Sequence, residues 1–227
     1  MDADSLKKLK RKIYFLFPLA FILLAAILML SAGSLKFWQG WVFCAVILVP
    51  ALFVAIYFFK RSPEFLERRM NFKEKEVRQK TIVKIADTFF FLGFLMPGLD
   101  YRFGWSAVPM WLVVVSDAII LAGYFLVFIS FKENYFAART VEIFEGQKLV
   151  DTGPYAVVRH PMYAGIIPMF LFMPLALGSF WALLPLIPVC VVIILRTLNE
   201  EEVLRRDLPG YNVYCEKVRY RLVPFVW

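Results

Sequence analysis

Long apolar runs separated by short charged segments dominate the chain. A run of roughly 20 apolar residues is enough to cross the hydrocarbon core of a bilayer, and three runs clearly meet that length: 13–33, 38–59 and 107–131. A fourth run, 82–99, is less apolar because Lys84 and Asp87 lie in its first turns, and we expect Pro97 and Gly98 to end it. The pattern therefore predicts four membrane spans in the first part of the chain.

A charge-free stretch, 161–195, follows later in the chain. As one helix it would be about 52 Å long, which is too long for one crossing of about 30 Å and slightly short for two. Pro174, Gly178 and Ser179 provide a break near its middle. We therefore predict a tight helical hairpin with arms that need not fully span, near 162–176 and 180–195.

The polar segments divide the chain near residue 132. Alternating charges over 60–84 predict one solvated helix at the membrane surface. The end of the chain predicts an amphipathic helix to about Asp207, a turn at Pro209-Gly210 and a short helix over 211–217. The expected fold is an all-α polytopic membrane bundle in two parts, with transmembrane spans in 1–131 and a loop, the hairpin and the amphipathic tail in 132–227.

Composition and charge agree with a membrane protein. The chain is 61% hydrophobic and its mean hydropathy is +0.67. Of the 26 Lys and Arg, 24 fall in four segments: 1–12, 60–84, 132–162 and 196–227. If every apolar run crosses the membrane, these four segments lie on the same side of it. The net charge of +8 therefore reflects membrane topology and does not indicate nucleic-acid binding. This bias predicts that both termini are cytosolic, with some attraction to anionic lipid headgroups.

The first apolar run is longer than the core of a cleavable signal peptide, so we expect an uncleaved signal anchor. The predicted location is an integral multi-pass position in a bacterial or archaeal plasma membrane or in the endoplasmic reticulum. Two of the three cysteines, Cys44 and Cys190, lie in predicted spans and Cys215 in the tail. With one histidine, His160, these give neither a disulfide framework nor a set of metal ligands.

Polar side chains concentrate just before the hairpin. Tyr155, Arg159, His160 and Tyr163 fall within nine residues at the expected lipid boundary. A simpler explanation exists for part of this segment, since an arginine anchors a helix at a membrane boundary and Pro161 suits a first helical position. Four hydrogen-bonding side chains at an interface where polar groups need partners nevertheless indicate a functional site.

A second polar cluster begins where the hairpin ends. Arg196 and Glu200 are one helical turn apart and share a face near the bilayer edge. The neighbouring Glu201 and Glu202 stand four residues before Arg205 and Arg206, so these residues could form only surface ion pairs. We regard Arg196 and Glu200 as the functional pair, suited to a ligand that is amphiphilic or carries both charges.

Asp117, next to Ser116, is a carboxylate near the middle of a predicted span. Such a residue is a functional candidate by default, and polar contact between helices explains it equally well. We leave it outside the predicted site.

Two segments together resemble the isoprenylcysteine carboxyl methyltransferase family: GQKLVDTGPYAVVRHPMYAG at 146–165 and RTLNEEEVLRRDLPGYNVYCEKVRYRLVP at 196–224. The phospholipid amine N-methyltransferases are similar. The motifs KLV, GPY, RHPMY, the Glu run, Tyr-x-x-Tyr and a final Arg-x-x-Pro occur in the expected order. The family consists of integral-membrane enzymes that use S-adenosyl-L-methionine. The resemblance implies that 132–227 is the catalytic part, in which a cytosolic loop and tail form the cofactor pocket.

The resemblance also implies which residues hold the cofactor. Those implied to line its adenosine end, largely through their backbone, are Gln147, Lys148, Leu149 and Val150. Those implied to contact its methionine and ribose portions are His160, Pro161, Met162 and Tyr163. Tyr155 is implied to close over the bound cofactor.

Catalytic roles are implied for the second cluster. Glu200, or Glu201 if the register shifts by one, corresponds to the residue that faces the cofactor's amino group or sulfonium, and Arg196 corresponds to the arginine aimed at the acceptor carboxylate. A carboxylate is ionised at pH 7 and needs no base to attack a sulfonium methyl group, so the enzyme mainly aligns the reactants and excludes water. The acceptor implied is lipophilic or lipidated, most simply a prenylcysteine-like carboxylate; a phospholipid amine stays open, as does the oligomeric state.

Two other classes of function remain. A sterol-reductase-like NADPH enzyme would share a related Arg-His-x-x-Tyr segment, but the chain lacks an evident basic pocket for a 2′-phosphate and its Glu triplet suits a cationic cofactor better. A non-catalytic lipid-binding membrane protein would tolerate loss of His160 and Glu200. Binding of S-adenosylhomocysteine, of NADPH, or of neither distinguishes the three.

Overall fold

The computed structural model describes residues 2–70, 77–136 and 147–227, with side chains for all of these except 77–86. These residues form eight α-helices and one short 3-10 helix, η1. Their bounds are α1 Ala3–Ala32, α2 Trp38–Arg61, α3 Pro63–Arg69, α4 Val77–Phe103, α5 Met110–Glu133, η1 Gly153–Ala156, α6 Pro161–Ala176, α7 Leu183–Asp207 and α8 Tyr211–Lys217.

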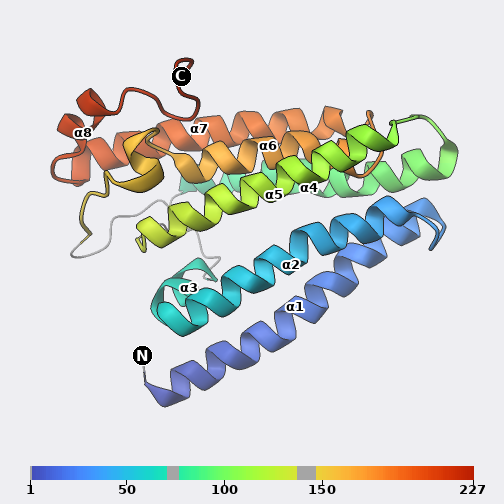
Figure 1. Cartoon of the computed structure of the whole chain (residues 1–227), viewed down its shortest axis with the longest axis horizontal. Helices are drawn as coiled ribbons and strands as arrows, with labels where there is room; N and C mark the ends of the chain where they lie inside the picture. Colours follow the sequence, from blue (N-terminus) through green and yellow to red (C-terminus); the bar gives the residue numbers. More distant parts are fainter. Residues whose placement is uncertain (1, 71–76, 137–146) are drawn as a thin grey trace.

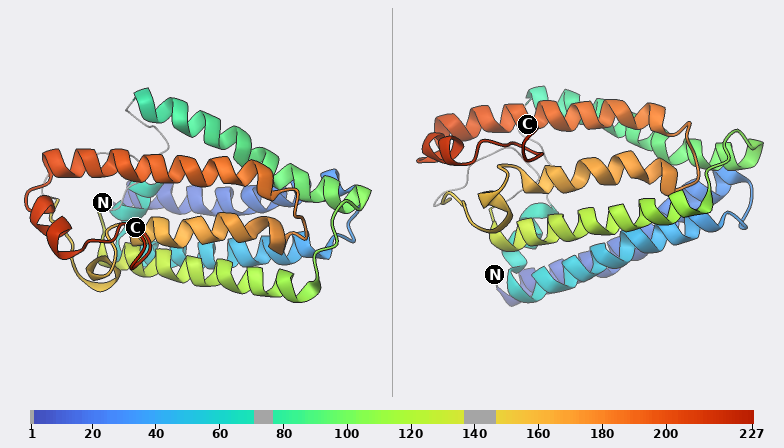
Figure 2. Two further views of the ribbon diagram at one scale, coloured as in Figure 1. Left: turned by 90° about the horizontal axis from the view of Figure 1, so that it is seen from above. Right: turned by 45° about the horizontal axis from the view of Figure 1, so that its top comes forward.

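The long helices run back and forth beside one another (Figure 1). The turns between α1 and α2, between α4 and α5 and between α6 and α7 lie at one end of the bundle, whereas α3, η1, α8 and both ends of the chain lie at the other, as Figure 2 shows from two further directions. Within the described residues, four helices are long and apolar enough to cross a membrane, namely α1, α2, α5 and α7. The predicted all-α polytopic bundle is confirmed.

The predicted end of the weak span at Pro97-Gly98 is wrong, because α4 continues through both residues to Phe103. A proline inside a membrane helix is tolerated where neighbouring helices and local adjustments satisfy the freed backbone groups. Gly98 has a packing role instead: a Cβ atom there would lie 1.8 Å from the Ser31 hydroxyl of α1. The lack of a side chain at Gly98 lets α1 and α4 pack closely.

The single surface helix predicted over 60–84 is also wrong. The end of α2, the short α3 and the start of α4 share this segment, and its residues 71–76 lie outside the described residues. Pro63 takes the first position of α3, where its missing N–H group is not needed. Phe65 of α3 is buried against Phe58 and Phe131, so α3 packs onto the bundle rather than lying free in solvent.

The hairpin is confirmed, with unequal arms. The 16 residues of α6 span about 24 Å, short of a full crossing, whereas the 25 residues of α7 span about 37 Å. α7 starts at Leu183 rather than near 180 and continues without a break through the amphipathic segment to Asp207. The turn at Gly210, which has a φ of 84°, and the predicted helix 211–217 are both observed.

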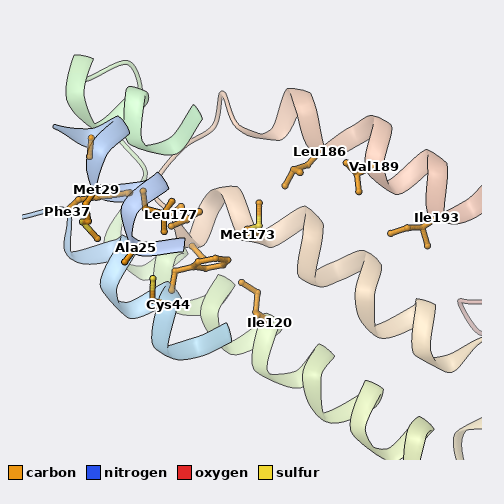
Figure 3. Close-up of a cluster of buried hydrophobic side chains, with 14 of the residues drawn as sticks. Ala25, Met29, Phe37, Cys44, Ile120, Met173, Leu177, Leu186, Val189 and Ile193 are labelled. Carbon is orange, nitrogen blue, oxygen red and sulfur yellow. The ribbon is translucent and has the colours of Figure 1, made fainter. Parts of the chain in front are cut away.

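Close packing of α5 against α6 fixes the start of the hairpin. A Cβ atom on Gly123 would lie 2.7 Å from the carbonyl oxygen of Gly165, and one on Gly165 would lie 2.8 Å from that of Gly123. The two backbones therefore touch, as small residues allow in membrane helices. The main buried cluster lies between α1, α2, α5, α6 and α7 (Figure 3) and continues along the hairpin to Tyr163 and Ile193.

Candidate active site

The Arg-His-Pro segment that precedes α6 lies against the end of the chain. The backbone N–H groups of Arg159 and His160 donate to the carbonyl oxygens of Tyr220 and Arg221, both at 2.9 Å. The carbonyl of His160 in turn accepts from Ala164 N–H and begins the first turn of α6. These bonds hold residues 159–160 between the hairpin and the residues after α8.

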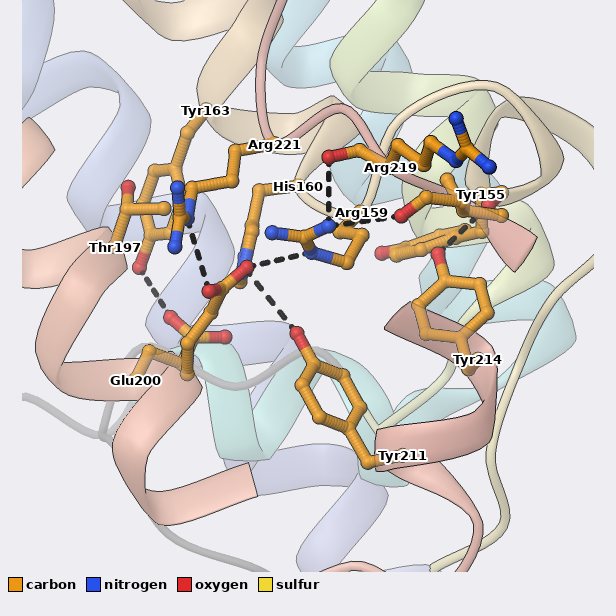
Figure 4. Close-up of polar contacts among 12 residues, drawn as sticks. Tyr155, Arg159, His160, Tyr163, Thr197, Glu200, Tyr211, Tyr214, Arg219 and Arg221 are labelled. Atoms are coloured by element: carbon orange, nitrogen blue, oxygen red, sulfur yellow. Dashed lines mark hydrogen bonds and ion pairs between the residues drawn. The ribbon is translucent and has the colours of Figure 1, made fainter. Parts of the chain in front are cut away.

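Glu201 is the centre of a buried ionic cluster. Its partners Arg159, His160 and Arg221 come together in Figure 4. Its side chain accepts from Arg159 Nε at 2.7 Å and from Arg221 Nε at 2.9 Å, and its Oε1 lies 3.3 Å from His160 Nε2. Only 3% of Glu201 is exposed. Because both carboxylate oxygens have donors, the buried charge is compensated on each side.

Arg159 extends this cluster to the residues after α8. Its Nη1 donates to the carbonyls of Val218 and Arg219 at 2.8 and 2.9 Å. Burial by itself lowers the pKa of the Arg159 guanidinium, but the hydrogen bond and negative charge of Glu201 raise that pKa above its ordinary value. Arg159 therefore stays charged and joins the loop before α6, the end of α7 and the segment after α8.

Arg196 and Glu200 meet at one tyrosine hydroxyl. Tyr163, which is buried, donates to Glu200 Oε2 at 2.8 Å and accepts from Arg196 Nε at 3.2 Å. Arg196 and Glu200 are half-buried and lie on α7, whereas Tyr163 lies on the first turn of α6. The structure thus brings the predicted pair together with a member of the first cluster, at the point where the apolar hairpin meets the polar segments.

The consecutive glutamates occupy different surroundings. Successive residues of a helix point about 100° apart, so Glu201 faces the buried cations while Glu200 faces Tyr163. The alternative of surface ion pairs does not describe Glu201, and Arg206 pairs with Asp207 at 2.8 Å rather than with Glu202. Glu202 is exposed. The run therefore contains one buried, one half-buried and one solvated carboxylate.

Three tyrosines surround the ionic cluster. Tyr214 donates its hydroxyl to the Tyr155 carbonyl at 2.7 Å, and the Tyr211 hydroxyl lies 3.5 Å from His160 Nε2. Burial raises the pKa of the Tyr211 phenol, and the charge of Glu201 raises it further. Tyr211 is therefore a neutral phenol at physiological pH.

The loop residues implied to line the adenosine end lie beside these tyrosines. Leu149 packs against the buried cluster that contains Tyr211 and Tyr214. Gln147 and Val150 are half-buried and Lys148 is exposed. Hydrophobic packing of one side chain thus holds the 147–150 segment next to α8.

A glycine turn links this loop to α5. Gly153 has a φ of 56°, in the left-handed region that favours glycine, and a Cβ atom there would lie 2.7 Å from Glu133 at the end of α5. The Thr152 hydroxyl donates to Glu133 at 3.1 Å. The close approach of Gly153 to Glu133 and this hydrogen bond hold the turn, and with it the buried Tyr155, at the same end of the bundle as His160. Pro161 is buried and Met162 half-buried at the start of α6.

Asp117 lies elsewhere. It is buried on α5, 16 residues and thus about 24 Å from Glu133 along the helix. Within the part of the chain that the structure describes, its Oδ1 has no hydrogen-bond partner. The geometry keeps Asp117 apart from the cluster at the other end of the bundle.

Sequence reasoning missed part of the cluster. Arg221, Tyr211 and Tyr214 receive no role from the sequence. In the structure Arg221 donates to Glu201, the Tyr211 hydroxyl lies close to His160 Nε2, and Tyr214 donates to the Tyr155 carbonyl. The available signal was the Tyr-x-x-Tyr spacing after a Pro-Gly turn. That spacing puts both phenols on one face of a short helix.

Comparison with known proteins supports the resemblance seen in the sequence. Residues 111–208 match the family model of phospholipid methyltransferases. The match begins within α5, upstream of the boundary predicted at residue 132, and includes both polar clusters but not Tyr211 or Arg221. Among curated proteins, none matches this chain. The matched family and the helical bundle together indicate a membrane methyltransferase.

Proposed function

We propose that this membrane methyltransferase transfers the methyl group of S-adenosyl-L-methionine to a lipophilic acceptor that carries a carboxylate. The observation that carries the proposal is the Tyr163 hydroxyl, which Arg196 and Glu200 share at the mouth of the apolar hairpin. One fixed cation and one fixed anion beside apolar helices suit a reaction between an anionic acceptor and a cationic donor. Arg196 would orient the acceptor and Glu200 the donor.

The residues at this site fit the cofactor. S-adenosyl-L-methionine supplies an electrophilic methyl group on a positively charged sulfur. Glu200 is half-buried and Tyr163 holds one of its carboxylate oxygens, so its negative charge is fixed in place near the membrane boundary. We assign the adenosine end to the backbone of 147–150 and the methionine and ribose portions to residues 160–163, with Tyr155 closing over them.

Glu201 has a different role in this proposal. Its two oxygens are already engaged by Arg159, His160 and Arg221. Glu201 therefore acts as a positioning residue, because it fixes the segment that carries His160 against α7. Glu200 is the better candidate for direct contact with the positive charge of the cofactor.

The predicted lack of a catalytic base agrees with a carboxylate acceptor. A carboxylate is already ionised at pH 7, so the chain's residues need only orient it, hold it close to the donor and keep water away. A guanidinium is the side chain best suited to orienting a carboxylate, because its planar donors match the two oxygens.

A phospholipid amine is the second candidate acceptor, and the matched family description favours it. An ammonium headgroup must lose a proton before it can accept a methyl group. Glu200, held by Tyr163, is the carboxylate placed to accept that proton. The NADPH-dependent and non-catalytic alternatives receive no support from the family match.

We also propose that the end of the bundle with both termini faces the cytosol, because the basic segments gather there. This orientation gives the water-soluble donor direct access to the polar segments on either side of the hairpin. The lipophilic acceptor would reach the same site from the membrane.

Two measurements on the detergent-purified protein test the function. Calorimetry should show saturable binding of S-adenosylhomocysteine, lost in His160→Ala, and no binding of NADPH. Transfer of labelled methyl groups to a farnesylated cysteine and to phosphatidylethanolamine then identifies the acceptor. NADPH binding alone would replace the proposal with a reductase, and binding of neither by folded protein would reject catalysis at this site.

A further inference from the structure

A groove between α1 and α2 lies apart from the candidate active site. It has a volume of about 530 Å³ and apolar walls that include Phe17, Leu52 and Ile56. Lys10 of α1 and Lys60 of α2 also line it. Since α1 and α2 are antiparallel (Figure 1), both lysines stand at the end of the groove nearest the chain termini.

The groove has the dimensions of a site for part of a lipid chain. Its lining on α1 extends from Lys10 to Pro18, and its lining on α2 from Leu52 to Lys60. Eight residues of helix rise about 12 Å, so the apolar walls extend that far from the lysines toward the middle of the membrane. Ile56 is 47% exposed, and the groove therefore opens on the face that lipid would cover.

The charges at the groove are unbalanced. No carboxylate of the described residues lines it. The neighbouring lysines of α1 have other contacts, because Lys8 pairs with Asp4 at 3.4 Å and Lys12 donates to the Met70 carbonyl at 3.2 Å. Lys10 instead lies 5.8 Å from the ring centroid of Tyr14, which also lines the groove. Two cations above an apolar wall are the complement of an anionic amphiphile.

We propose that this groove binds one anionic glycerophospholipid, with an acyl chain against the apolar walls and the phosphate between Lys10 and Lys60. Basic pockets between membrane helices bind anionic headgroups in this way. A zwitterionic lipid would fit the walls equally well but would bring its own positive charge toward the two ammonium groups. The groove uses residues of α1 and α2 only, so the ligand is separate from the acceptor at α6 and α7.

Native mass spectrometry of the full chain in mild detergent tests this proposal. The protein is titrated with phosphatidylglycerol and with phosphatidylcholine of identical acyl chains. We expect a saturable one-to-one complex with phosphatidylglycerol at a concentration at least about tenfold lower than with phosphatidylcholine, since each lysine near an anionic headgroup contributes roughly 1 kcal/mol, or about fivefold. The double variant Lys10→Ala/Lys60→Ala should bind the two lipids alike.

Three further variants make the result specific. Lys7→Ala/Lys8→Ala removes the same charge from side chains that line a different groove and should keep the preference for phosphatidylglycerol. Lys10→Arg/Lys60→Arg should also keep it, which shows that any loss is not a folding defect. Ile56→Trp fills the apolar wall and should weaken binding of both lipids.

Other results would overturn the proposal. Equal losses from the Lys7/Lys8 and Lys10/Lys60 pairs would show attraction to a diffuse basic surface rather than to a site. Equal binding of both lipids by the unaltered protein would show an apolar groove without headgroup recognition. Full competition by glycerophosphoglycerol, which has no acyl chains, would show an anion site and not a lipid site.

Discussion

Exchanging each of two neighbouring glutamates for glutamine separates structural support from ligand binding. In the unaltered protein, Arg159 and Arg221 donate to Glu201 at 2.7 and 2.9 Å. In Glu201→Gln, an amide NH2 group replaces one of the carboxylate oxygens and faces one of these guanidinium donors. The buried Arg159 charge also loses its anionic partner. Breaking a buried ion pair on one side costs about 3–5 kcal/mol. At about 2–4 °C per kcal/mol for a chain of this size, the melting temperature should fall by roughly 10 °C.

Glu200→Gln is the matched control. Glu200 is half-buried and accepts a hydrogen bond from Tyr163 at 2.8 Å, which the amide oxygen of glutamine can still accept. Its melting temperature should stay within about 2 °C of the unaltered protein. Its affinity for S-adenosylhomocysteine should fall by roughly tenfold or more if Glu200 faces the ammonium group, which this molecule keeps although it lacks the sulfonium charge. A hydrogen bond to a charged group contributes about 1.5–3 kcal/mol.

The assay is thermal unfolding of detergent-purified protein followed by intrinsic fluorescence, with calorimetric cofactor binding measured well below the melting temperature. A large drop in melting temperature for Glu201→Gln and a binding defect for Glu200→Gln would support the two different roles. Equal melting temperatures for the two variants would refute the inference that Glu201 holds the cluster together. A binding defect confined to Glu201→Gln would shift the direct contact to that residue.

Three further predictions follow from the same geometry. Tyr163→Phe removes the hydroxyl shared by Arg196 and Glu200. We expect kcat/KM for labelled methyl transfer to fall by roughly tenfold to a hundredfold, while the free energy of unfolding changes by only about 1 kcal/mol. An unchanged kcat/KM would argue against a positioning role for Tyr163. Arg196→Ala should raise KM for an anionic acceptor more than it lowers kcat, and an equal effect on an amine acceptor would contradict a carboxylate partner. Burial and the charge of Glu201 raise the pKa of Tyr211 in the folded protein. The contribution of this group to stability is therefore complete below its unfolded-state pKa of about 10 and is lost as pH rises above that value. The melting temperature should depend less steeply on pH between pH 8 and 11 in Tyr211→Phe, and identical slopes would show that folding does not raise the pKa of Tyr211.

Most of the helical bundle was predictable because lipid imposes two simple conditions. A span needs a minimum length of apolar chain, and basic residues collect on one side; run lengths and charge positions are both visible in the sequence. The short helix 211–217 was predictable because a Pro-Gly turn precedes it. Helix ends depended on packing, which the sequence does not show: Pro97 and Gly98 would end a solvated helix, but Gly98 lies against Ser31 of α1 and the helix continues.

The sequence by itself determined which residue types the site contains. It identified the Arg-His-Pro segment, Tyr163 and the Glu run because polar side chains are rare in so apolar a chain, and it placed Arg196 and Glu200 on one face because they are one helical turn apart. The tertiary structure alone decided which glutamate became buried. The rotation of α7 against α6 directs Glu201 to Arg159 and Arg221 and leaves Glu200 at Tyr163. That rotation depends on how the side chains of the whole bundle pack together, which the sequence does not show.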